Sequence, residues 1–76
     1  MKISLKAARV NANMTILEAA EKLGIGKDSL INWEREPWNI SALYQRKISE
    51  VYGLPIDMIN FFPTNIEFNS INDSDD

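Results

Sequence analysis

The stretch that decides the fold is TILEAAEKLGIGKDSLINWER, which covers residues 15–35. Thr15 and Glu18 form the Thr-x-x-Glu pattern of a capping box, so we predict that a helix begins there. Gly24 stands where a left-handed residue closes a helix, which limits this helix to about two turns. A further helix is predicted over residues 27–35, because the proline that follows ends the helical pattern. The pattern is that of two short helices joined by a tight turn.

The side chains around this turn have the spacing of a helix-turn-helix. A small residue at Ala20 lets the two helices approach closely, Ile25 fills the elbow, and Leu30 holds the second helix against the core. Trp33, three positions after Leu30, is predicted to point inward as well. A helix held in this way stands out from the body, and its outer residues can enter a DNA major groove, which is about 12 Å wide.

Helical spacing continues on both sides of this pair, and we predict an all-α fold of five helices. Ser4 can cap a first helix, and Ser41 can cap a helix over residues 42–52. Residues 37–39 are predicted to be a loop, and residues 54–59 a short fifth helix. The apolar positions expected to face inward in the outer helices are Leu5, Ala8, Val10, Leu43, Ile48 and Val51.

We expect one domain over residues 1–62, followed by a short extended tail over residues 63–76 that is partly disordered. The end of the tail is polar and acidic, as in chains that cannot bury a core. A short strand over residues 64–68 is an alternative for its first part. Four apolar residues here either cap the small core or form a dimer seam, namely Phe61, Phe62, Ile66 and Phe68.

The 76 residues include no Cys and no His. Disulfides, thiolate metal sites and thiol nucleophiles are thereby excluded, and the most common general base and transition-metal ligand are missing. We therefore expect a binding protein rather than an enzyme, with no cofactor and no metal. No segment is apolar enough to span a membrane and no leader opens the chain, so we expect a cytoplasmic protein without a membrane partner.

The net charge of −3 is unevenly distributed along the chain. Residues 1–56 contain all eight Lys and Arg residues and six acidic ones, whereas residues 57–76 contain five acidic residues and no basic one. A mildly basic body is compatible with an anionic partner. Dedicated nucleic-acid binders are usually far more basic, so the charge alone does not decide the function.

Taken together, many positions resemble the lambda-repressor/Cro family, which comprises the five-helix DNA-binding domains of phage repressors and the wider XRE regulators. The resemblance covers about residues 3–62. Its main positions are Leu5, Arg9, Met14, Thr15, Glu18, Ala20, Gly24, Ile25, Lys27, Ser29, Leu30, Trp33, Glu34, Lys47, Ile48, Tyr52, Gly53, Leu54, Asp57 and Ile59. The short chain is similar to a Cro-type regulator or to an antirepressor of the MOR type. The implied function is sequence-specific transcriptional regulation of a phage or prophage lysis–lysogeny switch in a bacterial host cell.

The resemblance also implies which residues contact double-stranded operator DNA in the major groove. The base-reading positions of the family fall on Lys27, Asp28 and Asn32, whose side chains suit guanine, cytosine and adenine respectively. The phosphate-contacting positions fall on Lys6, Ser29, Gln45, Arg46 and Lys47. The family link between the first helix and the end of the recognition helix implies an ion pair of Arg9 with Glu34. A homodimer is expected, at least on DNA, because palindromic operators present two half-sites.

Three departures from the family pattern leave a second function open. Ile16 replaces the usual Gln at the start of its helix, and Leu17 stands where a polar residue is common. The usual Asn-Gly after Glu34 is replaced by Arg35-Glu36. We predict that Ile16, Leu17 and Ile31 form an apolar patch, which is more typical of a protein interface than of a phosphate groove. The alternative function is therefore an antirepressor that binds the helix-turn-helix domain of the cognate phage repressor.

Overall fold

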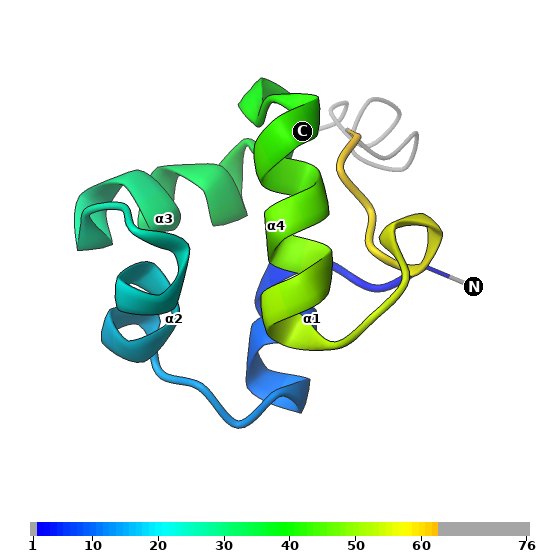
Figure 1. The fold of residues 1–76 in the computed structure, drawn as a ribbon. Helices are drawn as coiled ribbons and strands as arrows, with labels where there is room; N and C mark the ends of the chain where they lie inside the picture. Colours follow the sequence, from blue (N-terminus) through cyan, green and yellow to red (C-terminus); the bar gives the residue numbers. More distant parts are fainter. Residues whose placement is uncertain (1, 63–76) are drawn as a thin grey trace, which may run out of the picture.

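The computed structural model describes residues 2–62, and within them the chain is all-helical, as predicted, without a strand. In chain order the elements are α1 (Leu5–Asn11), α2 (Ile16–Leu23), α3 (Lys27–Arg35), the 3₁₀ turn η1 (Pro37–Asn39), α4 (Ala42–Tyr52) and the 3₁₀ turn η2 (Ile56–Met58). Helices α2 and α3 lie on one side of α4, and α1 lies beside its lower end (Figure 1). The expected tail over residues 63–76, with Ile66 and Phe68, lies outside the described residues.

The boundaries of α2 and α4 follow from capping residues of the sequence. At the start of α2 the hydroxyl of Thr15 accepts from the Glu18 N–H at 3.1 Å, and Oε1 of Glu18 accepts from the Thr15 N–H at 2.9 Å. Both halves of the capping box therefore form. Gly24 closes α2 at φ +74° and Gly53 closes α4 at φ +71°, in the left-handed region that favours glycine. Ser41 caps α4, so the predicted ends of both helices are confirmed.

One apolar core joins the four helices. Ala20 of α2 and Leu30 of α3 are both buried, as their positions beside the turn predict. The other buried apolar residues are Leu5, Ala8, Ala19, Leu23, Ile40, Ile48, Tyr52, Ile59 and Phe61. Trp33 is half-buried and packs against this core. Because α2 contributes two alanines to the core, its backbone can lie close to its neighbours.

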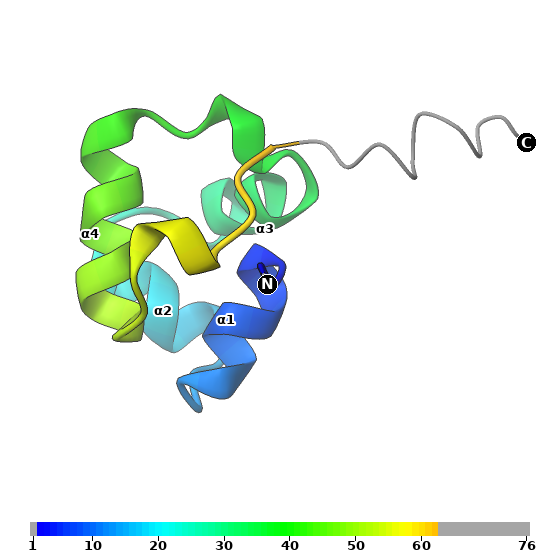
Figure 2. The same cartoon turned by 90° about the vertical axis from the view of Figure 1, so that its right-hand side faces the viewer.

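A short parallel bridge joins the two ends of the described chain. The Ile3 N–H donates to the Met58 carbonyl at 2.9 Å, and the Asn60 N–H donates to the Ile3 carbonyl at 2.8 Å. The segment through η2 crosses from the end of α4 toward the start of α1 (Figure 2). Ile59 and Phe61 extend from this segment into the core. This segment therefore covers the core on a side next to α4 (Figure 2).

The two connecting segments differ from their predictions. Residues 37–39 form the turn η1 and not a loop, because Pro37 suits the first position of a helical turn. Residues 54–59 contain only the 3₁₀ turn η2, so the expected fifth α-helix is not confirmed. Pro55 holds the extended geometry that precedes this turn, and the chain then enters the bridge at Ile59.

Val10 and Leu43 are exposed, whereas the sequence pattern predicts that they face inward. Each lies five positions from a buried residue of its own helix, Leu5 in α1 and Ile48 in α4. Five residues correspond to about 140° of rotation around the helix axis, so both side chains point away from the core.

Candidate nucleic-acid interface

Helix α3 presents one continuous outward face. Leu30 is fully buried and Trp33 is half-buried, so these two residues fix the inner side of the nine-residue helix. The opposite side carries Asp28, Ile31, Asn32 and Arg35, which are all exposed. Their spacing of three, four and seven positions arranges them in one line along the helix. We call these four residues the α3 stripe.

A hydrogen bond within the α3 stripe holds the side chain of Asn32. Nη2 of Arg35 donates to Oδ1 of Asn32 at 3.2 Å. An amide oxygen has two lone pairs and an amide nitrogen has two donors, so both ends of Asn32 keep hydrogen-bonding capacity. Arg35 is not among the DNA contacts predicted from the sequence, although its position three residues after Asn32 is a signal that could have placed it there.

The first turn of α3 carries the remaining predicted residues of this helix. Lys27 and Ser29 are exposed and flank Asp28 along the chain. The helix is capped by Gly26 without a side-chain hydrogen bond. Asp28 lies where the helix dipole favours a carboxylate. The three predicted base readers thus come from one helix, with Asp28 and Asn32 on the α3 stripe and Lys27 beside it.

An aromatic contact connects α3 to α4. The ring centroids of Trp33 and Tyr44 lie 5.1 Å apart, with their planes tilted by 59°. Nζ of Lys47 lies 5.9 Å from the Tyr44 centroid, within the range of a cation–π contact. A β-carbon added at Gly24 would lie 3.7 Å from the same Nζ. The ammonium group of Lys47 is therefore held beside the turn between α2 and α3.

The other predicted phosphate-contacting side chains differ in exposure and in whether they already form a hydrogen bond. Lys6 of α1 and Arg46 of α4 are exposed. Gln45 is half-buried, and its Nε2 donates to the Ile40 carbonyl at 3.2 Å. One of the two amide hydrogens of Gln45 remains for another acceptor. The predicted phosphate contacts thus come from α1, α3 and α4 rather than from one element.

An ion pair connects α1 to the end of α3. Nε of Arg9 donates to Oε2 of Glu34 at 2.6 Å, and Nη2 donates to Oε1 at 3.4 Å. Nη1 of Arg9 donates to the Met14 carbonyl at 2.9 Å. The two charged side chains are 10% and 12% exposed. The pair implied by the family resemblance is therefore present, and it also reaches the segment that links α1 to α2.

Tyr52 has a buried hydroxyl that makes no hydrogen bond within residues 2–62. Burial is the main cause that raises the pKa of Tyr52 to about 12. The negative charge of Glu34 raises this pKa further, and the positive charge of Arg9 opposes it. The neutral phenol is therefore the form that the folded protein favours.

The expected apolar patch on α2 and α3 is smaller than predicted. Ile16 is half-buried and packs against the core, because it lies four positions before Ala20 on the buried side of α2. Leu17 is 57% exposed and Ile31 is 41% exposed. Of the three residues predicted to form the patch, therefore, only Leu17 and Ile31 are exposed.

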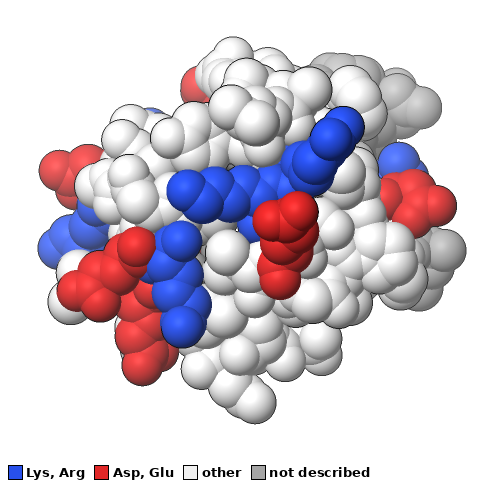
Figure 3. Space-filling view, viewed as in Figure 1, with Lys and Arg blue, Asp and Glu red and all other residues white. Residues whose placement is uncertain are grey.

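The charge of the described residues is mixed rather than uniformly basic. Residues 2–62 contain eight basic and seven acidic side chains. Basic side chains run across the region of α4, and acidic side chains gather on the side of α2 (Figure 3). A surface with this mixture of charges attracts an anionic partner only where several basic side chains lie close together.

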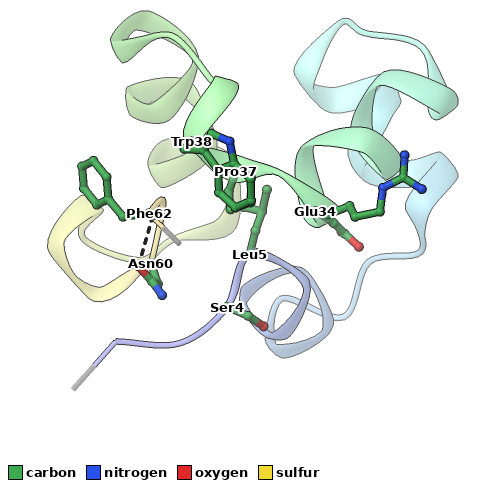
Figure 4. Close-up of a pocket in the computed structure, with 8 residues that line it drawn as sticks. Ser4, Leu5, Glu34, Pro37, Trp38, Asn60 and Phe62 are labelled. Atoms are coloured by element: carbon green, nitrogen blue, oxygen red, sulfur yellow. Dashed lines mark hydrogen bonds between the residues drawn. The ribbon is translucent and has the colours of Figure 1, made fainter. Parts of the chain in front are cut away.

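A second exposed surface lies between the start of α1, the end of α3 and the last described residues. Trp38 and Phe62 are exposed and line a hollow of about 110 Å³ (Figure 4). The other lining residues are Ser4, Leu5, Glu34, Arg35, Pro37 and Asn60. The neighbouring Phe61 is buried in the core, so of the two phenylalanines only Phe61 caps it.

Residues 5–59 match the model of the helix-turn-helix family. The chain belongs to this family. It is 40% identical over 55 residues to the HTH-type transcriptional regulator ImmR of Bacillus subtilis (strain 168), a match that covers 72% of the chain and 43% of that protein. The resemblance to XRE-type helix-turn-helix regulators is thereby confirmed. No solved structure matches the chain.

The helix lengths and the acidic side chains of residues 2–62 bear on two other functions, membrane spanning and metal binding. None of the helices within residues 2–62 has the length and apolar character that a membrane span requires. In the same part of the chain, acidic residues do not cluster in a group of three or more that could hold a metal ion.

Proposed function

We propose that this helix-turn-helix protein is a sequence-specific DNA-binding transcriptional regulator that inserts α3 into the major groove of an operator. The α3 stripe is the observation that carries the proposal, because four exposed side chains lie on one side of a helix that Leu30 anchors on the other. Family membership and the similarity to a transcriptional regulator support the same function. A major groove of about 12 Å accepts such a helix.

Lys27, Asp28 and Asn32 are the proposed base readers. A Lys ammonium can donate to the guanine O6 and N7 atoms, an Asn amide can pair with adenine, and a carboxylate can accept from the cytosine amino group. A good bidentate pair discriminates against the wrong base by about 1–3 kcal/mol. Exposure of all three side chains supports these roles.

The proposed phosphate contacts are Lys6, Ser29, Gln45, Arg46 and Lys47. Neutralised phosphates release counterions, so affinity falls as salt rises, and each lost contact flattens the logarithmic salt dependence by about 0.9. Lys47 is the best supported of the five, since its ammonium group lies beside the turn that leads into α3.

We further propose that the regulator binds its operator as a homodimer. Two half-sites of a palindrome lie about 34 Å apart, so two α3 helices must be held at that spacing. The exposed aromatic hollow of Trp38 and Phe62 supports a seam at the C-terminal end of α3, because aromatic residues are enriched in interfaces. A place in a phage or prophage lysis–lysogeny switch, as for Cro-type regulators, rests on the family resemblance alone.

Selection of duplexes from a randomised library by the full chain tests the proposal. We expect an enriched motif, and we expect Lys27→Ala and Asn32→Ala each to relax the preference at one position of it. Lys2→Ala is the matched control, because it removes the same charge as Lys27→Ala from an exposed side chain outside the helix-turn-helix. No enriched motif, or an unchanged motif in both α3 variants, would refute DNA reading by α3.

The exposure of Leu17 and Ile31 favours one second candidate, an antirepressor that binds the helix-turn-helix domain of its cognate phage repressor. In that case the chain alone selects no DNA motif. A pull-down of the repressor should then succeed with the wild-type chain and fail with Leu17→Asp. Capture that survives both Leu17→Asp and Ile31→Asp would exclude this surface.

A further inference from the structure

The middle of the α3 stripe is apolar. Ile31 is 41% exposed and lies between Asp28 and Arg35, its neighbours one turn before and one turn after. A β-branched side chain in a helix has one strongly preferred χ1 rotamer, so the γ2 methyl group of Ile31 is held in a fixed place. A ligand of the α3 stripe therefore meets a rigid apolar group between two charged ones.

The charged neighbours of Ile31 decide which surface can cover it. Burial of Asp28 or Arg35 against an apolar protein surface is costly, because neither charge would find a partner there. The floor of a major groove offers a partner to each, the cytosine amino group to Asp28 and the guanine acceptors to Arg35. It also offers one apolar group, the 5-methyl group of thymine. The chemistry of the α3 stripe therefore matches a groove that contains thymine.

Asn32 lies next to Ile31 with its amide already oriented. The side chain of Arg35 only donates, so the amide atom at 3.2 Å from it is the oxygen of Asn32. An amide that reads adenine must present its oxygen to N6 and its nitrogen to N7. An amide held in one orientation loses less freedom on binding than a free one. Arg35 thus acts as a positioning residue for Asn32.

We propose that Ile31 reads thymine: its side chain contacts the 5-methyl group of a thymine in each half-site, next to an adenine that is read by the amide of Asn32. This inference rests on the proposed DNA-binding function. It adds the class of base that the apolar position selects, and it gives Ile31 a role other than that of a protein contact.

Replacement of thymine by deoxyuridine tests the inference, because it removes the 5-methyl group and nothing else. The probe is a short duplex that the full chain has selected from a randomised library, with each thymine replaced in turn. Burial of one methyl group corresponds to about a fourfold change in affinity. The wild-type protein should therefore lose about fourfold at one thymine of each half-site. Ile31→Ala should bind the unmodified duplex more weakly and should not distinguish thymine from deoxyuridine at that position.

Two more variants separate this contact from general effects. Val10→Ala also shortens an exposed β-branched side chain, but on α1, and should keep the deoxyuridine sensitivity of the wild type. Arg35→Ala should weaken the preference for adenine at the neighbouring position, whereas the loss of a phosphate contact alone would lower the affinity for all sequences equally.

The outcomes distinguish the inference from the function on which it rests. A wild-type protein that selects a motif yet tolerates every deoxyuridine overturns the inference and leaves the proposed function intact. An Ile31→Ala variant that keeps the full sensitivity to deoxyuridine at the same thymine also overturns the inference and leaves the proposed function intact. If the chain selects no motif at all, the proposed function fails and the inference fails with it.

Discussion

Replacement of Glu34 by Gln should remove a large part of the stability of this domain. The change keeps the shape of the side chain and removes its charge, so the guanidinium of Arg9 stays charged while its side chain is 10% exposed. Arg9 would keep its bond to the Met14 carbonyl at 2.9 Å. Loss of one partner of a buried ion pair costs about 3–5 kcal/mol, and we expect about 3 kcal/mol because the amide of Gln still accepts one hydrogen bond.

A loss of this size is a large fraction of the total free energy of unfolding. Small domains are stable by about 0.05–0.15 kcal/mol per residue, which gives roughly 4–11 kcal/mol for 76 residues. Glu36→Gln is the matched control, because it removes the same charge two positions later. There the exposed carboxylate accepts from Nδ2 of Asn39 at 3.1 Å. Its effect should stay within about 0.5 kcal/mol.

Urea unfolding followed by circular dichroism measures both variants. Equal losses for Glu34→Gln and Glu36→Gln would refute the reasoning, as would a loss below about 1 kcal/mol for the former. The double variant Arg9→Met with Glu34→Leu adds a second check. It should recover most of the loss if an unpaired charge causes it, because apolar replacement of both partners removes that charge.

The remaining predictions concern single side chains of the core and the caps. Tyr52→Phe should leave the melting temperature unchanged or raise it, because the lost hydroxyl is buried without a partner in residues 2–62. Since the pKa of Tyr52 rises from 10 to about 12 on folding, this group should cost the wild-type protein about 2 kcal/mol of stability as the pH rises from 10 to 12, and unfolding of Tyr52→Phe over this range should lack that loss. Gly24→Ala should cost about 1–2 kcal/mol in urea unfolding, because φ is +74° there, and Gly24→Asn should cost less. Thr15→Ala should cost about 1 kcal/mol by the same measurement, since it removes one half of the capping box.

Each of these predictions can be contradicted by a specific result. A strongly destabilised Tyr52→Phe variant would mean that the hydroxyl has a partner. Equal costs of Ala and Asn at position 24 would exclude the left-handed backbone as the cause, and an unchanged stability of Thr15→Ala would mean that water replaces the cap.

The sequence predicts the boundaries of α2 and α4 well because their signals are local. Thr15, Glu18 and Gly24 act through hydrogen bonds within one helix turn of themselves. The orientation of a helix toward its neighbours is not local, and so the exposure of Val10 and Leu43 could not be read from helical spacing. The bridge that follows η2 depends on Ile3 near the beginning of the chain, which lies outside any local stretch of sequence around residues 54–59.

The candidate site is predictable to a similar degree. The inward positions Leu30 and Trp33 determine which residues of α3 face out, and Asp28 and Asn32 follow from them. The bond from Arg35 to Asn32 depends on how two side chains lie, which spacing alone does not determine. The DNA contacts of all these residues remain predictions until binding is measured.

The pairing of Ile3 with Ile59 and Asn60 has a practical consequence for how this domain can be handled. A fluorophore, an affinity tag or a second domain attached ahead of Lys2 would leave the molecule across α4 from the first turn of α3 (Figure 1). Immobilisation through the beginning of the chain would therefore leave the first turn of the recognition helix open to solution. Surface-based binding assays of Lys27 and Asp28, which lie in that first turn, can use this attachment point.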